Sequence, residues 1–153
     1  MITKIFSIFI LSALYLTAHC SITFEIVGAC EKNAFFKETL PFYNEPISVG
    51  HLTVDILQRE NIPFDGSAQG IKTITSIPAK DNELLIISDT ELLAYGWCYK
   101  VNGLAPEVYP HKVEVSDGDH IEWYFAFSRY LNGEWVSQCK PSYLEPRREF
   151  CSN

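Results

Sequence analysis

The feature that most constrains the fold is a long stretch in which apolar and polar residues alternate. From residue 71 to residue 138 the alternation recurs in short runs, and a period of two is typical of half-buried β-strands. The pairs Asn102-Gly103 and Asn132-Gly133 separate such runs, and both residue types accept the positive φ angles of tight hairpin turns. This part of the chain therefore predicts an antiparallel meander.

Further strands are expected on both sides of a single helix. Between Ser48, the expected N-cap, and Ile62, apolar residues recur at helical spacing, and residues 65–70 are expected to form a loop. The order predicts an α+β fold, a β-grasp-like mixed sheet with one amphipathic helix packed on one face; a β-sandwich is the alternative. The expected strands are 21–27, 35–42, 71–76, 84–87, 96–101, 112–115, 120–127, 127–131 and 134–138.

The first twenty residues differ in composition from the rest. Residues 1–20 contain no acidic residue, one lysine and 14 apolar residues, and their apolar run is shorter than the roughly 20 residues that span a membrane. They are typical of a cleaved signal peptide, with the cut before Ser21 or after Ala18. An uncleaved anchor and lipidation of Cys20 are the alternatives. We expect residues 21–153 to form a single secreted domain, periplasmic or extracellular, with no stable membrane span.

The charge of the expected mature chain excludes one class of partner. Residues 21–153 carry 11 basic and 19 acidic side chains, a net charge of −8 with histidine neutral. A nucleic-acid-binding protein needs a basic surface to meet phosphates, so nucleic acid is not an expected partner. A small molecule and another protein remain as partner classes.

Four cysteines remain after a cut before Ser21, namely Cys30, Cys98, Cys139 and Cys151. An even number in an exported chain indicates two disulfides, and four cysteines allow three pairings. No pair has the C-x-x-C spacing of a zinc or redox site. Because Cys139 and Cys151 follow the last strong strand, we favour bridges that tie the final segment back to the sheet.

The motifs of common enzymes and metal sites are missing from the sequence. It contains neither a G-x-S-x-G elbow nor an H-E-x-x-H motif. Asp117, Asp119 and Glu122 lie within six residues, but calcium takes six to eight oxygen ligands, and an Asp-Gly-Asp turn explains these carboxylates without an ion. We therefore expect no catalytic residue, no metal ligand and no enzymatic activity.

The abundance of aromatic residues is the remaining clue to function. The expected mature chain has 18 Phe, Trp and Tyr residues, and exposed rings bind flat ligands, sugars and proteins, although strands also use rings as cross-strand pairs and core filler. Tyr109 and Trp135 lie in or beside loops and are the first ligand-binding candidates, followed by Tyr99 and Tyr130. The positions expected at a sheet face or loop are Tyr95, Tyr99, Tyr109, Tyr124, Tyr130, Trp135 and Tyr143.

Three motifs in the same region carry a family resemblance. They are G-W-x-Y-x-V-N-G at residues 96–103, D-G-D at 117–119 and I-x-W at 121–123. With these motifs, residues 47–127 resemble the transcobalamin-like C-terminal domain family, a set of small secreted domains. The resemblance implies a β-grasp-like fold outside the cytoplasm. Because such a domain closes over the corrinoid in cobalamin transporters, it also implies cobalamin as a ligand to test.

Three functions are consistent with these observations. The first is a secreted, non-catalytic binding or interaction module of unknown ligand, with contacts from the loops between residues 101 and 112 and between 127 and 138. The second is direct binding of a corrinoid or another flat small molecule, with no other cofactor expected. The third, a hydrolytic enzyme, has no nucleophile that the sequence identifies.

Overall fold

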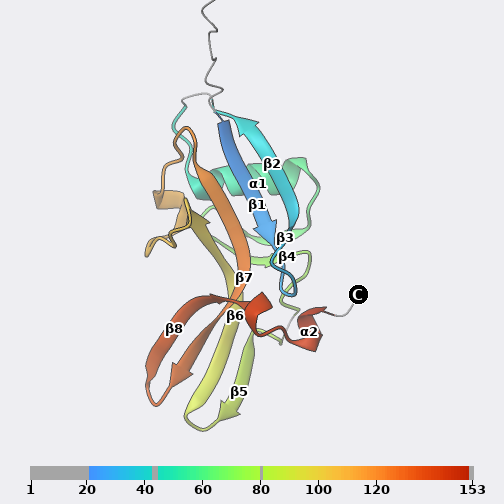
Figure 1. Cartoon of the computed structure of the whole chain (residues 1–153), viewed down its shortest axis with the longest axis vertical. Coiled ribbons are helices and arrows are strands. Elements are labelled where there is room, and N and C mark those ends of the chain that lie inside the picture. Colours follow the sequence, from blue (N-terminus) through green and yellow to red (C-terminus); the bar gives the residue numbers. More distant parts are fainter. Residues whose placement is uncertain (1–20, 43–44, 80, 152–153) are drawn as a thin grey trace, which may run out of the picture.

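The structure is a computed structural model that describes residues 21–42, 45–79 and 81–151 (Figure 1). The expected signal peptide and Cys20 lie outside the described residues. The fold is α+β, as expected. In chain order its elements are β1 (Ser21–Val27), β2 (Ala34–Pro41), α1 (Val49–Arg59), β3 (Phe64–Ser67), β4 (Gly70–Ile74), β5 (Leu84–Ser88), β6 (Glu91–Val101), η1 (Pro110–Lys112), β7 (His120–Leu131), β8 (Glu134–Pro141), η2 (Ser142–Leu144) and α2 (Arg148–Cys151).

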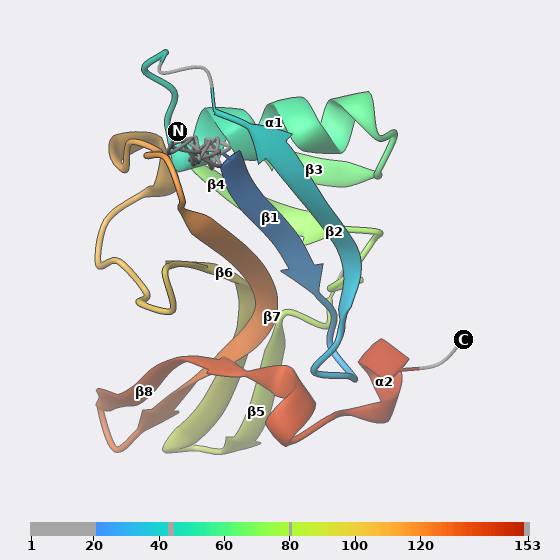
Figure 2. The ribbon, with the colours of Figure 1, turned by 45° about the horizontal axis from the view of Figure 1, so that its top comes forward.

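The main sheet has the strand order of a β-grasp. Its neighbours run β2, β1, β7, β6, β5, and β8 pairs with β7 off this path. β1 is parallel to β7, whereas the pairs β1–β2, β6–β7, β5–β6 and β7–β8 are antiparallel. The helix α1 follows the β1–β2 hairpin and packs across one face of the sheet (Figure 2). The expected mixed sheet with one covering helix is therefore confirmed.

The long central strand β7 changes its partner along its length. Residues 120–124 run parallel to β1, and residues 126–131 pair with β8 on the same side. On the other side, β6 accompanies β7 throughout, and β5 pairs with only the first part of β6. The sheet thus has a part next to α1 and a second part made of β8, β7, β6 and β5 at the opposite end of the molecule (Figure 1).

Helix α1 begins at the expected cap. Ser48 Oγ accepts the backbone N–H of His51 at 3.2 Å, which satisfies one of the free donors of the first turn. The helix ends at Arg59 rather than at residue 62. Its buried face reaches the sheet, where the indole N–H of Trp123 donates to Thr53 Oγ1 at 2.8 Å. A buried polar pair therefore joins α1 to β7 within an otherwise apolar core.

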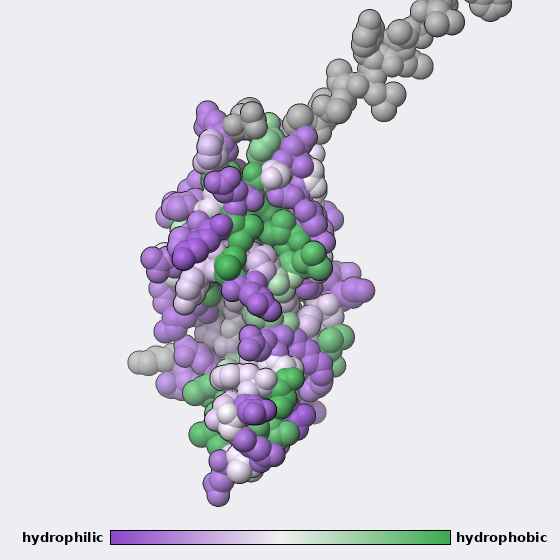
Figure 3. Space-filling model, turned by 90° about the vertical axis from the view of Figure 1, so that its left-hand side faces the viewer, coloured by the Kyte–Doolittle hydropathy of each residue, from purple (hydrophilic) through white to green (hydrophobic). Residues whose placement is uncertain are grey.

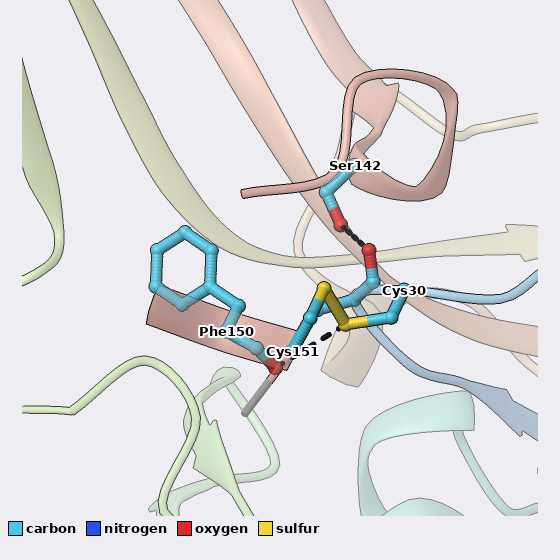
Figure 4. Close-up of a disulfide and its surroundings, with 5 residues drawn as sticks. Cys30, Ser142, Phe150 and Cys151 are labelled. Atoms are coloured by element: carbon cyan, nitrogen blue, oxygen red, sulfur yellow. Dashed lines mark hydrogen bonds between the residues drawn. A yellow bond between two sulfur atoms is a disulfide. The ribbon is translucent and has the colours of Figure 1, made fainter. Parts of the chain in front are cut away.

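The C-terminal segment is tied back to the sheet by the disulfide Cys30–Cys151 (Figure 4). Phe150 inserts its ring against Tyr95 and Phe125, each with a centroid distance of 4.9 Å. Nearby, the buried Ser142 hydroxyl donates to the Ala29 carbonyl at 2.9 Å. The Cys30 sulfur lies 3.3 Å from the Phe150 carbonyl oxygen, a close contact without a hydrogen bond because a disulfide sulfur carries no hydrogen.

The second disulfide, Cys98–Cys139, crosses the opposite face of the sheet. Together the two bridges realise the favoured pairing, in which both late cysteines return to earlier parts of the fold. Below the second bridge, the fully buried Tyr124 donates its hydroxyl to the Cys139 carbonyl at 3.1 Å. Burial raises the pKa of Tyr124 to about 12, and the neighbouring Glu122 and Tyr143 add to the rise.

The raised pKa of Tyr124 predicts a specific loss of stability in alkali. A raised folded-state pKa stabilises the protein fully below the unfolded value near 10, and this contribution disappears as the pH rises through about 12. Two pKa units correspond to about 2 to 3 kcal/mol. The Tyr124→Phe variant should lose about 1 kcal/mol at neutral pH, since it lacks the hydroxyl hydrogen bond, but should lose less stability than the parent above pH 10.

The measurement is urea unfolding as a function of pH, with tyrosinate absorbance followed in the same samples. Tyr130→Phe serves as a control because Tyr130 is only half buried and does not contribute to the raised pKa of Tyr124. Equal alkaline destabilisation of the parent and the Tyr124→Phe variant would contradict the assignment.

Two expected elements differ in the structure. Residues 112–115 form no strand; instead Val49 N–H donates to the Val113 carbonyl and Val115 N–H to the Ile47 carbonyl, so their alternating apolar side chains pack beside the start of α1. Residues 65–70 were expected as a loop but lie largely in the β3–β4 hairpin. The strand β3 is exposed at three of its four residues, so it lacks the alternation that marks a half-buried strand. The second strand of the hairpin, β4, corresponds to the expected strand 71–76 but ends at Ile74.

Other boundaries also differ from expectation. β6 starts at Glu91, five residues before the expected start at Gly96, because its first part pairs with β5. The sequence patterns do not predict the short segments η2 and α2. Tertiary contacts, namely the packing of Phe150 and the Cys30–Cys151 disulfide, hold this part of the chain in place. Among the described residues, no helix is long and apolar enough to cross a membrane.

Candidate functional site

A hollow lies along the edge of β6, between the β3–β4 turn and the loop of residues 104–110. Its volume is about 280 Å³, and Gly70, Trp97, Tyr99 and Tyr109 are among its lining residues. A second hollow of about 840 Å³ adjoins it between the same loop and β8. We call the combined hollow the β6 slot. The residues that line both parts are Ala105, Pro106, Val108, Tyr109 and Cys139.

The loop beside the β6 slot presents large apolar side chains to solvent. Leu104 is 76 % exposed, Tyr109 66 % and Val108 51 %. Figure 3 faces the side of the molecule that carries this loop, and hydrophobic side chains gather in the middle of that side above a hollowed region. Exposed apolar side chains beside a concavity are typical of a binding surface.

The loop is held in place by hydrogen bonds from β6. The Tyr99 hydroxyl donates to the Val108 carbonyl at 2.7 Å, and Val101 N–H donates to the Leu104 carbonyl at 2.9 Å. Pro110 is buried, and the Tyr109 and His111 rings stack at 5.9 Å. The exposed side chains of the loop therefore stand on a backbone that is fixed at both ends.

The Asp-Gly-Asp turn at residues 117–119 is hydrogen-bonded to residues at the end of β6 and the start of β1. Asp119 is buried and accepts hydrogen bonds from the Asn102 side chain at 2.8 Å and from Ser116 N–H at 2.7 Å. Asp117 accepts Ser21 N–H at 2.8 Å, and Lys100 pairs with Glu122 at 2.7 Å. Each of the three carboxylates thus has a protein donor. Within the described ranges, no group of three or more His, Cys, Asp or Glu side chains is arranged to hold a metal ion.

The electrostatic character of the β6 slot is weakly acidic. Glu107 is the only charged side chain among its lining residues. Burial raises the pKa of the Tyr99 hydroxyl above its usual value, and the neutral hydroxyl donates to the Val108 carbonyl. The slot therefore combines an apolar wall, backbone polar groups and one carboxylate.

The structure divides the four ligand-binding candidates into two places. Tyr99 and Tyr109 both line the β6 slot, Tyr99 from beneath and Tyr109 from the exposed rim. Tyr130 and Trp135 form an edge-to-face pair at 5.3 Å near the β7–β8 turn and do not line the slot. The expected exposure of Tyr95, Tyr99 and Tyr124 is wrong, because these rings fill the layers between the sheet and its covering segments.

Sequence reasoning missed a second apolar surface on the four-stranded part of the sheet. Ile86 opposes Leu92, Leu92 opposes Tyr130, and Tyr130 opposes Trp135. Ile86 is 74 % exposed and Trp135 48 % exposed. The run L-L-I-I at residues 84–87 carried the signal, since an uncharged apolar strand at a sheet edge is a known site of association.

One serine and histidine contact bears on the hydrolase hypothesis. Ser48 Oγ lies 2.8 Å from His51 Nδ1, but the same oxygen caps α1 by accepting His51 N–H. The two residues are only three positions apart at the start of the helix, and no described carboxylate is hydrogen-bonded to the His51 ring. Capping accounts for this contact.

Another hollow, of about 470 Å³, lies between the end of β2 and α1. It combines apolar residues such as Leu40 and Ile56 with the charged Asp55 and Arg59. Its wall includes residues 42 and 45, which flank two positions outside the described residues. We therefore consider the β6 slot as the candidate site.

Comparisons with known proteins identify one family model and one similar structure. A model described as a domain of unknown function, DUF4430, matches residues 61–126, a range that includes β6 and the loop 104–110. A solved structure from Ruminococcus gnavus ATCC 29149, described as a candidate metal-binding protein, is 18 % identical with a TM-score of 0.40, and the match covers 69 % of this chain and 95 % of that chain. No curated protein matches the chain.

Proposed function

We propose that the protein is a non-catalytic binding module and that its ligand occupies the β6 slot. The observation that carries the proposal is the exposure of Leu104, Val108 and Tyr109 beside the hollow, on a loop that hydrogen bonds from β6 hold at both ends. A preformed apolar concavity with a few fixed polar groups loses little entropy when a ligand binds.

We further propose that the protein works after export from the cytoplasm, periplasmic or extracellular according to the host. Two disulfides support this proposal, because such bridges persist in oxidising compartments. The composition of residues 1–20 supports it as well.

The finer family assignment is also part of the proposal. The motifs between residues 96 and 123 support a relation to the transcobalamin-like C-terminal domain family. A corrinoid is therefore one ligand to test directly at the β6 slot, and the same measurement distinguishes it from other apolar ligands.

The test compares the variants Tyr109→Ala and Trp135→Ala with the parent. Nile red, a neutral apolar dye, is titrated by fluorescence, and cyanocobalamin is titrated by calorimetry. Tyr109→Ala should weaken dye binding about tenfold, the effect of losing one central aromatic contact, whereas Trp135→Ala should leave it within about twofold. Tyr109 is 66 % exposed and Trp135 48 % exposed, so neither variant should unfold the protein.

The outcomes separate the alternatives. Unchanged dye binding in Tyr109→Ala, or a loss confined to Trp135→Ala, would remove the β6 slot as the binding site. Cyanocobalamin binding that weakens in Tyr109→Ala would identify a corrinoid as a ligand. No heat at high cyanocobalamin concentration would exclude the corrinoid and leave other ligands.

A further inference from the structure

The floor of the β6 slot is the edge of a strand rather than one of its faces. Trp97, Cys98 and Tyr99 are consecutive, and all three line the hollow. Side chains of consecutive strand residues point to opposite faces, so a cavity that touches all three lies along the backbone edge. The slot therefore offers main-chain groups as well as side chains.

The backbone groups at this edge point away from β7. In an antiparallel strand, alternate residues direct their N–H and C=O to opposite sides. Tyr95 N–H donates to Glu83, and Val101 N–H donates to Leu104, both on the side away from β7. Trp97 and Tyr99 lie two and four residues after Tyr95 on the same strand, so their N–H and C=O groups also point away from β7. No described residue pairs with their backbone N–H or C=O groups, so two donors and two acceptors face the slot.

The neighbouring elements leave room for another strand. β5 pairs with β6 only as far as Ala94, and β4 lies across the slot without a hydrogen-bonded ladder to β6. A Cβ added at Gly70, on the opposite wall, would meet no heavy atom within 4 Å. The edge is thus uncovered between the β3–β4 turn and the exposed loop.

We infer that the β6 slot binds an extended basic peptide, which adds as a strand to the free edge of β6. The inference rests on the proposed function and names the ligand class. Alternating donors and acceptors at strand spacing match a polypeptide backbone, and Val108 and Tyr109 provide an apolar wall for its side chains. A corrinoid or a dye would contact the apolar wall but would not form the alternating main-chain hydrogen bonds of an added strand.

The acidic charge of the slot and of the whole chain favours a basic partner. Glu107 is the only charged residue in the lining, and the chain has 19 acidic against 12 basic residues. An acidic protein attracts basic segments and repels a second copy of itself. A lysine-containing strand is therefore favoured over self-pairing at this edge.

The probe is an acetylated, amidated nonapeptide of alternating lysine and valine. Its control alternates lysine and proline, which keeps the charge but removes half of the donors and the strand pattern. Binding is measured by fluorescence anisotropy of labelled peptide, and hydrogen exchange of the Trp97 and Tyr99 amides is measured by NMR. We expect these two amides to exchange about tenfold more slowly in the complex, because new main-chain bonds protect them.

Two glycine variants provide a matched pair. Gly70→Val adds a branched side chain at the wall of the slot. Gly96→Val adds the same side chain on β6, at a residue that does not line the slot and where a Cβ also meets no heavy atom within 4 Å. Gly70→Val should weaken the lysine and valine peptide about tenfold or more, and Gly96→Val should change it less than about threefold. Thermal unfolding checks that both variants fold.

Several results would overturn the inference. Equal affinity for the proline peptide, or peptide binding without protection of Trp97 and Tyr99, would show charge attraction alone. A dimer in sedimentation that protects these amides without peptide would identify a second copy as the occupant. If the peptide does not bind while Nile red binding depends on Tyr109, the peptide inference fails but the proposed function stands; if neither binds, both fail.

Discussion

Replacing Cys30 and Cys151 together by alanine is expected to lower the free energy of unfolding by about 5 kcal/mol. The bridge joins residues 121 positions apart, and the entropy lost by the unfolded chain grows with the length of the closed loop. The bridge also holds the Phe150 ring against Tyr95 and Phe125. Urea unfolding under non-oxidising and oxidising conditions measures the change, with thiol alkylation to verify the bridge.

The second bridge provides the control for this prediction. Cys98 and Cys139 are 41 positions apart, and the same relation gives about 4 kcal/mol for their removal. We therefore expect the pair Cys30→Ala and Cys151→Ala to be the more damaging. A loss below about 1 kcal/mol for that pair would mean that the C-terminal segment does not close the loop in solution.

Replacing Gly50 by alanine is expected to cost about 3 kcal/mol, although alanine favours helices by about 1 kcal/mol over glycine. Gly50 lies in the first turn of α1, and a Cβ there would stand 1.9 Å from the Ala68 carbonyl oxygen. That oxygen belongs to backbone, which cannot rotate away as a side-chain end can. The helix and the β3–β4 turn would have to move apart.

The control for the Gly50 prediction is Gly96→Ala, where an added Cβ meets no heavy atom within 4 Å. That change should be neutral or stabilise slightly, because glycine costs entropy on folding. Urea unfolding of both variants gives the comparison. A Gly50→Ala protein as stable as the parent would show that the helix and hairpin are not in close contact.

The same contact links stability to the proposed function. Gly70, in one wall of the β6 slot, directly follows the β3–β4 turn, and Gly50 allows that turn to lie against α1. A shift of the turn would change the width of the slot. We therefore expect ligand binding to weaken in Gly50→Ala under conditions where the variant remains folded.

Local patterns accounted for much of the architecture. The alternation in residues 21–27 and 120–127, the cap at Ser48 and the Asn132-Gly133 hairpin turn depend on neighbouring residues, and all these elements occur in the structure. Asn102-Gly103 also forms a turn with positive φ, but it leads into the loop 104–110 and not into the expected hairpin strand. The expected strand at 112–115 was wrong because Val113 and Val115 pair with the segment before α1 instead of with the sheet. The alternation from Ile71 also predicted β4, whereas β3, exposed at three of its four residues, carried no apolar alternation to detect.

The candidate site was only partly predictable. The sequence placed Tyr109 in an exposed loop, and the structure agrees. It could not show that Tyr99 is buried under that loop, nor that Trp135 lies with Tyr130 elsewhere. Period-two patterns state which side chains share a face, but not what covers that face.

The sequence by itself determined the α+β class, the single main helix, its cap and the turn of the β7–β8 hairpin, because each follows from periodicity and turn chemistry within a few residues. Only the tertiary structure decided which cysteines pair, which tyrosines are buried and that the edge of β6 stays open between Gly70 and Tyr109. Those features arise from contacts between residues tens of positions apart. Local sequence patterns are compatible with several such arrangements, and packing and the available space decide which one forms.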